Sequence, residues 1–329
     1  MRLPSHTDIA GTFDCIDNDL DRVKDLLTEE MSDCPDASVG EFVGYFNRYW
    51  GKMLRPALVL LSASACGPVA DEHIHLAAIM ELIHNATLLH DDVIDEGKMR
   101  RGAPTINSLW GNESAVLLGD FLLSKAFRMC AALPPHIIRK ISATTIRLCE
   151  GELRQIIQRQ NWRLSEDEYI EIITEKSAAL FSVCCELGAL VAGSGKTDVK
   201  SLASFGLNTG ITFQITDDLL DIIGDENKTG KTLGSDVSKN KLTLALIHLL
   251  KTVDEKKRQS LKRKLSAAEE NKQTLKKMLG RFGSLEYAQK RARHFAAKAV
   301  ESLAGLKQSG AKDALIQTAG LIAARAKTA

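Results

Sequence analysis

The distribution of proline limits the possible folds of this sequence more than any other feature. All seven prolines lie within the first 135 residues of the 329-residue chain, and none follows Pro135. Proline interrupts helices because it lacks an N–H donor and its ring clashes with the preceding turn. Strand signals are weak, since aromatic residues make up only 5% of the chain and no run of alternating β-branched residues is bounded by turn chemistry. The sequence therefore predicts an all-α fold.

Apolar residues recur with a helical period almost everywhere. No change in composition marks a linker, so we expect one domain over residues 1–329, a large helical bundle with a central layer of buried helices. No apolar stretch reaches the length of a membrane span without a charge, which takes about 18 residues. The pattern predicts helices at about 7–31, 38–48, 52–66, 71–96, 108–132, 135–160, 166–192, 197–223, 239–251, 253–265, 267–281, 284–306 and 311–327.

Charge and cysteine content exclude several classes of protein. The formal net charge is +1, so nothing overall indicates binding to nucleic acid. The seven cysteines are scattered and form no CxxC pair, which is typical of reduced thiols in a cytoplasmic protein. The N-terminal stretch soon turns acidic and has no apolar core, so we expect no signal peptide.

One stretch, residues 80–104, sets three carboxylates in an apolar run. Asp91, Asp92 and Asp95 are followed closely by Arg100 and Arg101. On a helix Asp91 and Asp95 share a face, and His84 lies on the same stripe. Buried carboxylates without a cation repel one another and take up protons. Carboxylates that leave room for water and phosphate oxygens are suited to Mg²⁺, and arginines are suited to phosphates.

A second acidic stretch, residues 213–225, repeats this design. Asp217, Asp218 and Asp221 have the spacing of the first three aspartates, lie among apolar residues, and follow Gln214 by one turn. A single motif of this spacing is common on helix surfaces. Two in one chain, both with apolar flanks, indicate a site rather than two solvated helix ends.

Basic residues accompany the two motifs. Lys52 and Arg55 are three apart and share a helix face, while Lys176, Lys231 and Lys241 flank apolar helices. Each one alone is explained by a solvated surface. Together with the carboxylates they predict a cavity for two phosphorylated substrates, one held through metal and the other mainly by side-chain cations. His84 taken alone is better explained as a structural histidine, and only its position two turns before Asp91 makes a functional role equally consistent.

At these residues the sequence resembles the trans-isoprenyl diphosphate synthases, which are all-helical prenyltransferases. The match covers about residues 45–245, and the following motifs occur in the same order: GKMLRP, ELIHNATLLHDDVIDEGKMRRG, EKSAALF, GITFQITDDLLDIIGD and GKTLGSDVSKNKLT. Two positions depart from the family pattern. Trp50 stands where glycine is usual and Ser177 where threonine is common, and neither removes a charged ligand.

The resemblance implies a reaction and a set of roles. An allylic diphosphate such as farnesyl or geranylgeranyl diphosphate ionises with the help of about three Mg²⁺ ions, and isopentenyl diphosphate adds to the cation. Homodimers are usual in the family. The implied metal ligands are Asp91, Asp95, Asp217 and Asp221, with Asp92, Asp218 and Lys176 completing the catalytic set. Isopentenyl diphosphate would be bound by Lys52, Arg55, His84 and Arg101, and the allylic diphosphate by Arg100, Lys176, Ser177, Gln214, Lys231 and Lys241.

The residues just before the first motif bear on product length. Ala86 and Thr87 stand five and four residues before Asp91, where short-chain members place an aromatic residue. Because both side chains are small, and because the stretch most resembles long-chain members that make quinone side chains, we expect a product of more than four isoprene units. A shorter-chain product is the alternative.

Three other functions remain alternatives. A class I terpene cyclase shares the fold and the first motif but does not explain Lys52 and Arg55. An HD-type phosphohydrolase, suggested by His90-Asp91, does not explain the second motif. A non-catalytic synthase subunit typically lacks the aspartates that are all present here. The basic stretches at 251–281 and 287–298 are explained by a solvated face, or by transient contact with anionic lipid during product release.

Overall fold

The computed structural model describes residues 9–32, 37–47, 51–224, 236, 239–266 and 272–325. Within these residues helices dominate, as the sequence predicts, and the only strands are two residues long. In order, the elements are η1 (Ile9–Thr12), η2 (Asp14–Ile16), α1 (Asp17–Ser32), α2 (Ala37–Asn47), α3 (Leu54–Ser64), α4 (Asp71–Ile94), β1 (Met99–Arg100), β2 (Ala103–Pro104), α5 (Ile106–Cys130), α6 (Pro135–Ile157), α7 (Glu166–Ile173), η3 (Thr174–Ala178), α8 (Ala179–Val191), α9 (Lys196–Ile223), α12 (Leu244–Thr252), α13 (Glu255–Ser266), α14 (Lys272–Arg281), α15 (Ser284–Ser302) and α16 (Gly310–Ala324).

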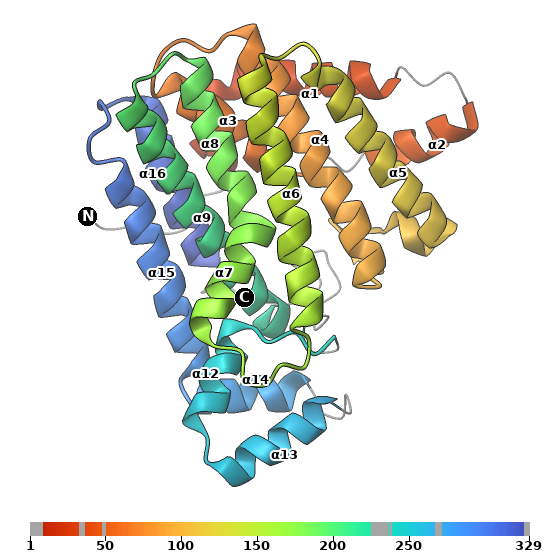
Figure 1. The fold of residues 1–329 in the computed structure, drawn as a ribbon, viewed down its shortest axis with the longest axis vertical. Coiled ribbons are helices and arrows are strands. Elements are labelled where there is room, and N and C mark those ends of the chain that lie inside the picture. Colours follow the sequence, from red (N-terminus) through yellow and green to blue (C-terminus); the bar gives the residue numbers. More distant parts are fainter. Residues whose placement is uncertain are drawn as a thin grey trace.

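The long helices run side by side along the molecule, and the short helices α12, α13 and α14 close one end (Figure 1). α9 packs along both α8 and α15, and α4 packs along α5. α4 and α9 bury apolar residues over most of their circumference, which is typical of helices in the centre of a bundle. That central position explains why the aspartates at their C-terminal ends are surrounded by protein.

Two apolar clusters stabilise the bundle. The larger cluster contains residues of every helix from α1 through α6, of α8, of the first half of α9, of the end of α15 and of α16. The smaller joins the second half of α9 to α7 and to α12–α15. Burial of apolar side chains contributes about 25 cal/mol per Å², so these clusters hold both carboxylate-bearing helices in place. The organisation into one domain stays a prediction.

The predicted helix at 166–192 is interrupted. α7 and α8 are separated by the π-helical turn η3, which inserts one extra residue into the helix. Neighbouring backbones approach this turn closely: a Cβ on Gly151 of α6 would lie 2.3 Å from the Lys176 nitrogen, and one on Gly210 of α9 would lie 2.5 Å from the Ala178 Cα. Only glycine fits at these two positions, so the turn is locked between α6 and α9.

Other departures from the predicted elements are small. Residues 99–104, expected to be a connection, form the hairpin β1–β2, with Met99 opposite Pro104. The helix expected at 239–251 begins only at Leu244, because the preceding backbone is extended and Lys241 N donates to the Asp236 carbonyl. No helix in the described part of the chain combines the length and apolar character that a membrane span needs.

Candidate active site

The first aspartate motif lies where α4 ends. Asp95 caps the C-terminus of α4, and the hairpin that follows folds back so that Arg100 reaches Asp92. The Arg100 guanidinium donates to both carboxylate oxygens, with Nε 2.9 Å from Oδ1 and from Oδ2 and Nη2 2.7 Å from Oδ1. Burial would lower the pKa of Arg100, but Asp92, Asp91 and Asp217 outweigh it and raise the pKa. Asp92 is thereby held by a charged partner.

Asp91 faces Lys176 of η3. Burial raises the pKa of Asp91 to about 6, although Lys176 opposes the shift. The Lys176 Nζ itself is 2.5 Å from Glu152 Oε2 and donates to Gln155 Oε1 at 2.7 Å, both on α6. Burial works against the charged lysine, yet Asp91 and Glu152 raise its pKa. The ammonium group is therefore a permanent charge beside a carboxyl group that is only partly compensated.

Asp95 lies beside two cations. Lys241 Nζ lies 2.7 Å from Oδ1 and 2.8 Å from Oδ2, and Arg159 Nη2 is 3.6 Å from Oδ1. Burial alone would raise the pKa of Asp95, but Lys241 outweighs it and the pKa is lowered. Lys241, itself 6% exposed, also lies 3.6 Å from Asp236 Oδ1.

The second motif, near the C-terminus of α9, has neutral partners at its middle aspartate. Asp218 Oδ2 accepts a hydrogen bond from the Tyr169 hydroxyl, and Oδ1 accepts one from Gln214 Nε2, both at 2.7 Å. The Ser177 hydroxyl in turn donates to Gln214 Oε1 at 2.6 Å. Burial and the charge of Asp236 raise the pKa of Asp218 to about 7.

The two motifs face a common space. Arg100 is close enough to both Asp91 and Asp217 for each to raise its pKa. A second link runs from Asp95 to Lys241 and Asp236, whose backbone N–H donates to Asp221 Oδ2 at 3.2 Å. The C-terminal ends of α4 and α9, which are far apart in the sequence, thus place their carboxylates near the same cations.

The residues expected to bind isopentenyl diphosphate are split between buried and exposed positions. Arg55 lies over two aromatic rings that contact each other, with its Cζ 4.7 Å from the Phe181 centroid and 5.3 Å from that of Phe213. Burial and the neighbouring arginines lower the pKa of His84 well below its usual value, so His84 is neutral beside Arg55 and Arg101. Lys52 is exposed. Lys231 lies outside the described residues.

Magnesium fits the carboxylates in chemical type. The middle aspartates, Asp92 and Asp218, have both oxygens engaged by protein donors. Asp91 keeps a raised pKa, which indicates a carboxyl group short of positive charge. Among the described residues no three acidic, histidine or cysteine side chains form a ready-made metal cluster. Mg²⁺ needs none, since one or two carboxylates, water and substrate phosphates complete its shell.

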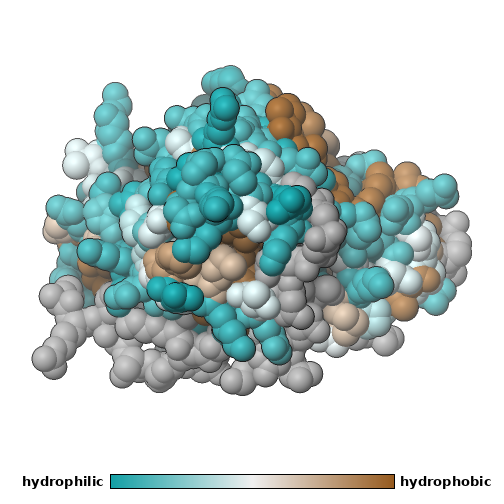
Figure 2. Space-filling model, turned by 90° about the horizontal axis from the view of Figure 1, so that it is seen from below, coloured by the Kyte–Doolittle hydropathy of each residue, from teal (hydrophilic) through white to brown (hydrophobic). Residues whose placement is uncertain are grey.

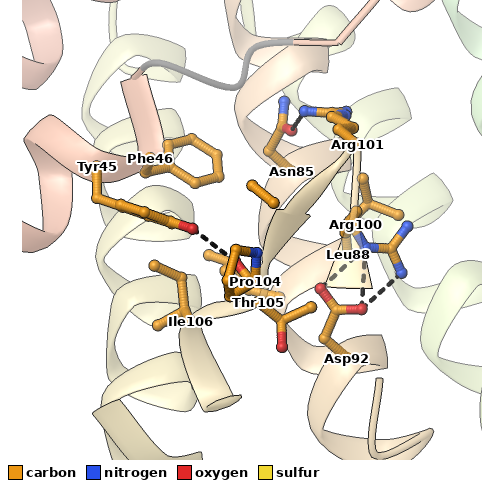
Figure 3. Close-up of a pocket in the computed structure, with 12 residues that line it drawn as sticks. Tyr45, Phe46, Asn85, Leu88, Asp92, Arg100, Arg101, Pro104, Thr105 and Ile106 are labelled. Atoms are coloured by element: carbon orange, nitrogen blue, oxygen red, sulfur yellow. Dashed lines mark hydrogen bonds and ion pairs between the residues drawn. The ribbon is translucent and has the colours of Figure 1, made fainter. Parts of the chain in front are cut away.

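Ala86 and Thr87 occupy different environments. Ala86 has no exposed surface, whereas Thr87 is partly exposed and donates from Oγ1 to the His84 carbonyl at 2.7 Å. On the neighbouring face of α4, Leu88 and Asp92 line a small cavity of about 50 Å³ between α2, α5 and the hairpin (Figure 3). That volume holds only a few water molecules.

Several residues of the site were not predicted from the sequence. Tyr169 stands two turns before Lys176, a spacing that could have suggested a shared face, but a lone tyrosine carries no motif. Glu152 and Arg159 reach the site from α6 and the segment after it, which sequence spacing cannot reveal.

His90 and Asp91 do not form a metal-binding dyad. The His90 Nε2 turns toward α5, 3.2 Å from the Val116 carbonyl and 3.5 Å from Asp120 Oδ1. Adjacent residues on a helix point roughly 100° apart, which separates His90 from the carboxylates. This arrangement counts against an HD-type phosphohydrolase.

Comparison with known proteins decides the family. Residues 37–281 match the model of the family described as polyprenyl synthetase. This chain belongs to the polyprenyl synthetase family. The assignment agrees with the resemblance seen in the motifs and makes the protein a prenyltransferase of the all-α isoprenyl diphosphate synthase fold.

Relatives of this polyprenyl synthetase family member differ in product length. The octaprenyl diphosphate synthase of Haemophilus influenzae is 35% identical over 320 residues, 93% of each chain. The short chain isoprenyl diphosphate synthase of Methanothermobacter thermautotrophicus is 34% identical over 281 residues, 84% of this chain and 86% of the relative. A polyprenyl synthase from Caulobacter crescentus, crystallised with calcium and isoprenyl diphosphate, is 29% identical with a TM-score of 0.91, covering 97% of this chain and 99% of that one.

Proposed function

We propose that this prenyltransferase condenses isopentenyl diphosphate with an allylic diphosphate, such as farnesyl or geranylgeranyl diphosphate, to give an all-trans polyprenyl diphosphate. The observation that carries the proposal is the pair of carboxylate motifs that both face Arg100, the first of them also facing Lys176. Carboxylates that bind a divalent ion and cations that bind phosphate are both needed to hold a diphosphate as it departs.

The chain's residues would divide the work between two diphosphates. Asp91 and Asp95 on one side, and Asp217 and Asp221 on the other, would hold magnesium, with three ions as the expected number. Bound magnesium supplies positive charge as negative charge develops on the leaving diphosphate. Arg100, Lys176 and Lys241 would add to that stabilisation from the protein side, while Ser177 and Gln214 face the same substrate.

The second substrate would be held by Lys52, Arg55, His84 and Arg101. Neutral His84 can donate one hydrogen bond to a phosphate oxygen, while the arginines supply charge. The apolar residues around both motifs exclude water, which would otherwise capture an allylic cation. No nucleophilic side chain is needed, because the double bond of isopentenyl diphosphate attacks.

The direct test is an elongation assay. Purified protein is incubated with Mg²⁺, isopentenyl diphosphate and a series of allylic diphosphates, and the product mass is measured. Growth of the product by five-carbon units is expected, with none in excess chelator. A cyclic hydrocarbon formed without isopentenyl diphosphate would instead support a terpene cyclase. Absence of product with every primer would favour a non-catalytic subunit.

We propose a product longer than four isoprene units, of the kind used in quinone side chains. Support comes from the small, partly exposed Thr87, one helical turn before Asp91. The relatives include long-chain and short-chain synthases at similar identity, so they do not decide the length. Thr87→Phe should shorten the product, because residue 87 lies about one helical turn, roughly 5.4 Å, below Asp91 and a ring there would block the path of a growing chain. Ala86→Phe is the harsher change, since Ala86 has no exposed surface. Unchanged product length in both variants contradicts the argument.

A homodimer is the proposed assembly. Apart from Met99, the large apolar side chains exposed in the described residues lie on α5 and α6, and Leu117, Phe127 and Ile157 are 67%, 58% and 77% exposed. Such a concentration is typical of an interaction surface. Light scattering should give twice the chain mass, and Leu117→Glu with Ile157→Glu should shift it to the monomer.

Transient membrane contact is a further part of the proposal. The end of the molecule that carries α13 is largely hydrophilic, with hydrophobic side chains toward one side (Figure 2). Lysines and arginines such as Lys256, Lys257 and Arg263 lie on that end. Co-sedimentation with vesicles should depend on anionic lipid if the contact exists. A cytoplasmic location stays a prediction from the cysteine pattern.

A further inference from the structure

Arg101 occupies an unfavourable backbone conformation. It has φ of 54° and the following Gly102 has φ of 78°, so the two form the turn between β1 and β2. Paired positive φ values are typical of a type I′ turn, but only glycine adopts them without strain. A chain that keeps arginine here needs contacts that hold the side chain in place.

Two such contacts surround the guanidinium group. Nη1 donates to Asn85 Oδ1 at 3.2 Å (Figure 3). On another side, a Cβ on Gly51 would lie 2.5 Å from Nη2 and 2.8 Å from Cζ, so Arg101 lies across bare backbone. The same contact brings Arg101 beside the segment that carries Lys52 and Arg55.

Asn85 is itself held by a buried acid. Its Nδ2 donates to Glu81 Oε1 at 3.0 Å and to the Glu81 carbonyl at 2.8 Å, one turn back on α4. Both residues are only 1% exposed. These bonds fix the orientation of the amide, so that its oxygen must point toward Arg101.

The buried carboxylate also balances the arginines. Glu81 Oε2 and Arg55 Nε are buried without hydrogen-bond partners among the described residues. Glu81 nevertheless acts on Arg55 and Arg101 through space, opposing the effect of burial on the pKa of each. Isolated buried charges are costly unless compensated, so Glu81 helps to keep both guanidinium groups charged.

We propose that Asn85, oriented by Glu81, is a positioning residue that aims Arg101 at the diphosphate of isopentenyl diphosphate. This inference rests on the proposed function, because it assigns a device to one of its two substrate subsites. In this proposal neither Asn85 nor Glu81 contacts the substrate. Their effect is confined to the subsite that Arg101 shares with Lys52 and Arg55, and it leaves the allylic subsite unchanged.

The decisive variant is Asn85→Ala. A hydrogen bond to a charged group has a large enough effect that we expect KM for isopentenyl diphosphate to rise about tenfold. KM for the allylic diphosphate and kcat should stay within about twofold. A rescue variant carries both Glu81→Gln and Asn85→Asp. It keeps the net charge and the acceptor for Arg101 and reverses the hydrogen bond between the two side chains, but it loses the bond to the Glu81 carbonyl. KM should therefore return part of the way to the parent value.

A second variant reaches the same guanidinium from the other side. Gly51→Ala adds one methyl group against Arg101 and should raise the same KM, whereas Gly44→Ala, whose Cβ would meet nothing within 4 Å, is the matched control and should not. Gly51→Ala also serves if Asn85→Ala fails to fold. An unchanged KM for isopentenyl diphosphate in the folded variants would overturn the proposal. A parallel rise of the KM values for both substrates together with a lower Tm would also overturn it.

Calorimetry separates the two levels of inference. Binding of isopentenyl diphosphate to the Mg²⁺-loaded protein is measured directly for each variant. If the parent protein fails to elongate any primer, the proposed function fails, yet a tenfold loss of affinity in Asn85→Ala would still support the positioning role. If the parent elongates and the affinity is unchanged in Asn85→Ala and Gly51→Ala, the positioning role alone is wrong.

Discussion

The two aspartate motifs have the same spacing, but the middle aspartate has a charged partner in the first motif and neutral partners in the second. In the first, Asp92 is held by the guanidinium of Arg100 and Asp95 by the ammonium of Lys241. In the second, the middle aspartate, Asp218, is held by a phenol and an amide. Equal spacing therefore does not mean that the protein compensates the carboxylate charges equally. At the middle position the first motif is compensated by a protein cation, whereas Asp218 of the second depends on a proton or an added cation.

The largest expected effect comes from removing one outer aspartate of each motif. Asp91→Ala and Asp217→Ala should each lower kcat by at least about 10³-fold, because each removes charge that would hold metal against the leaving diphosphate. Steady-state kinetics measures the loss. Asp120→Ala, an exposed aspartate on α5, is the control and should leave kcat unchanged. Retained activity in either site variant would exclude that motif from catalysis.

Breaking the charged pair of the first motif should destabilise the fold. Arg100→Leu leaves Asp92 buried without its partner, and we expect the free energy of unfolding to fall by about 2 kcal/mol, since Arg100 is partly exposed. Urea denaturation measures the change. Asp92→Asn combined with Arg100→Leu should recover part of it. Equal stability of the single and double variants would mean that the pair contributes little.

The pH dependence of stability should differ in sign between Asp218 of the second motif and Asp95 of the first. Asp218 has a folded-state pKa raised to about 7, so in metal-free protein its contribution becomes less favourable as pH rises from about 4 to 7. Asp95 has a lowered pKa, so its contribution is present above its unfolded-state value and is lost as pH falls. Asp218→Asn should therefore make the fall in the free energy of unfolding between about pH 4 and pH 7 smaller, by more than about 1 kcal/mol.

Asp95→Asn is the matched comparison for that experiment. It should lower the free energy of unfolding near pH 7, reduce the further loss on acidification, and leave the slope of stability against pH near pH 7 almost unchanged. Unfolding is followed by circular dichroism in chelator at a series of pH values. Identical profiles for the two variants would remove the electrostatic distinction between the motifs.

The smallest expected effect is at Tyr169. Tyr169→Phe removes one neutral hydrogen bond to Asp218 and should lower the free energy of unfolding by about 1 kcal/mol. That value is half the effect expected for Arg100→Leu. Because Gln214 still donates to Asp218, the carboxyl group keeps its place. A loss larger than that in Arg100→Leu would reverse the ranking of charged and neutral partners.

Sequence reasoning predicted the helical fold and the two motifs because both depend on local spacing. The i, i+4 relation placed Asp91 and Asp95 together, and apolar flanks indicated that they are buried. It could not assign partners that depend on how helices pack. Lys241 was expected to bind substrate, and its contact with Asp95, 146 residues earlier, arises only from the tertiary fold.

Sequence reasoning also missed the break between α7 and α8. Residues 166–192 have a continuous helical pattern, since one inserted residue changes the period too little to show in a short window. The approach of Gly151 and Gly210 to η3 is a property of three helices together. The hairpin that carries Arg100 and Arg101 was likewise expected only as a connection.

The extra residue in η3 sets the rotation of α7 relative to α8 about the helix axis. Deleting one residue from Thr174–Ala178 would restore a regular helix and rotate α7 by roughly 100° relative to α8. Tyr169 would then turn away from Asp218 while Phe181 kept its place under Arg55. A single inserted residue thus sets how the side of the site that would hold metal is rotated relative to the side predicted to bind isopentenyl diphosphate.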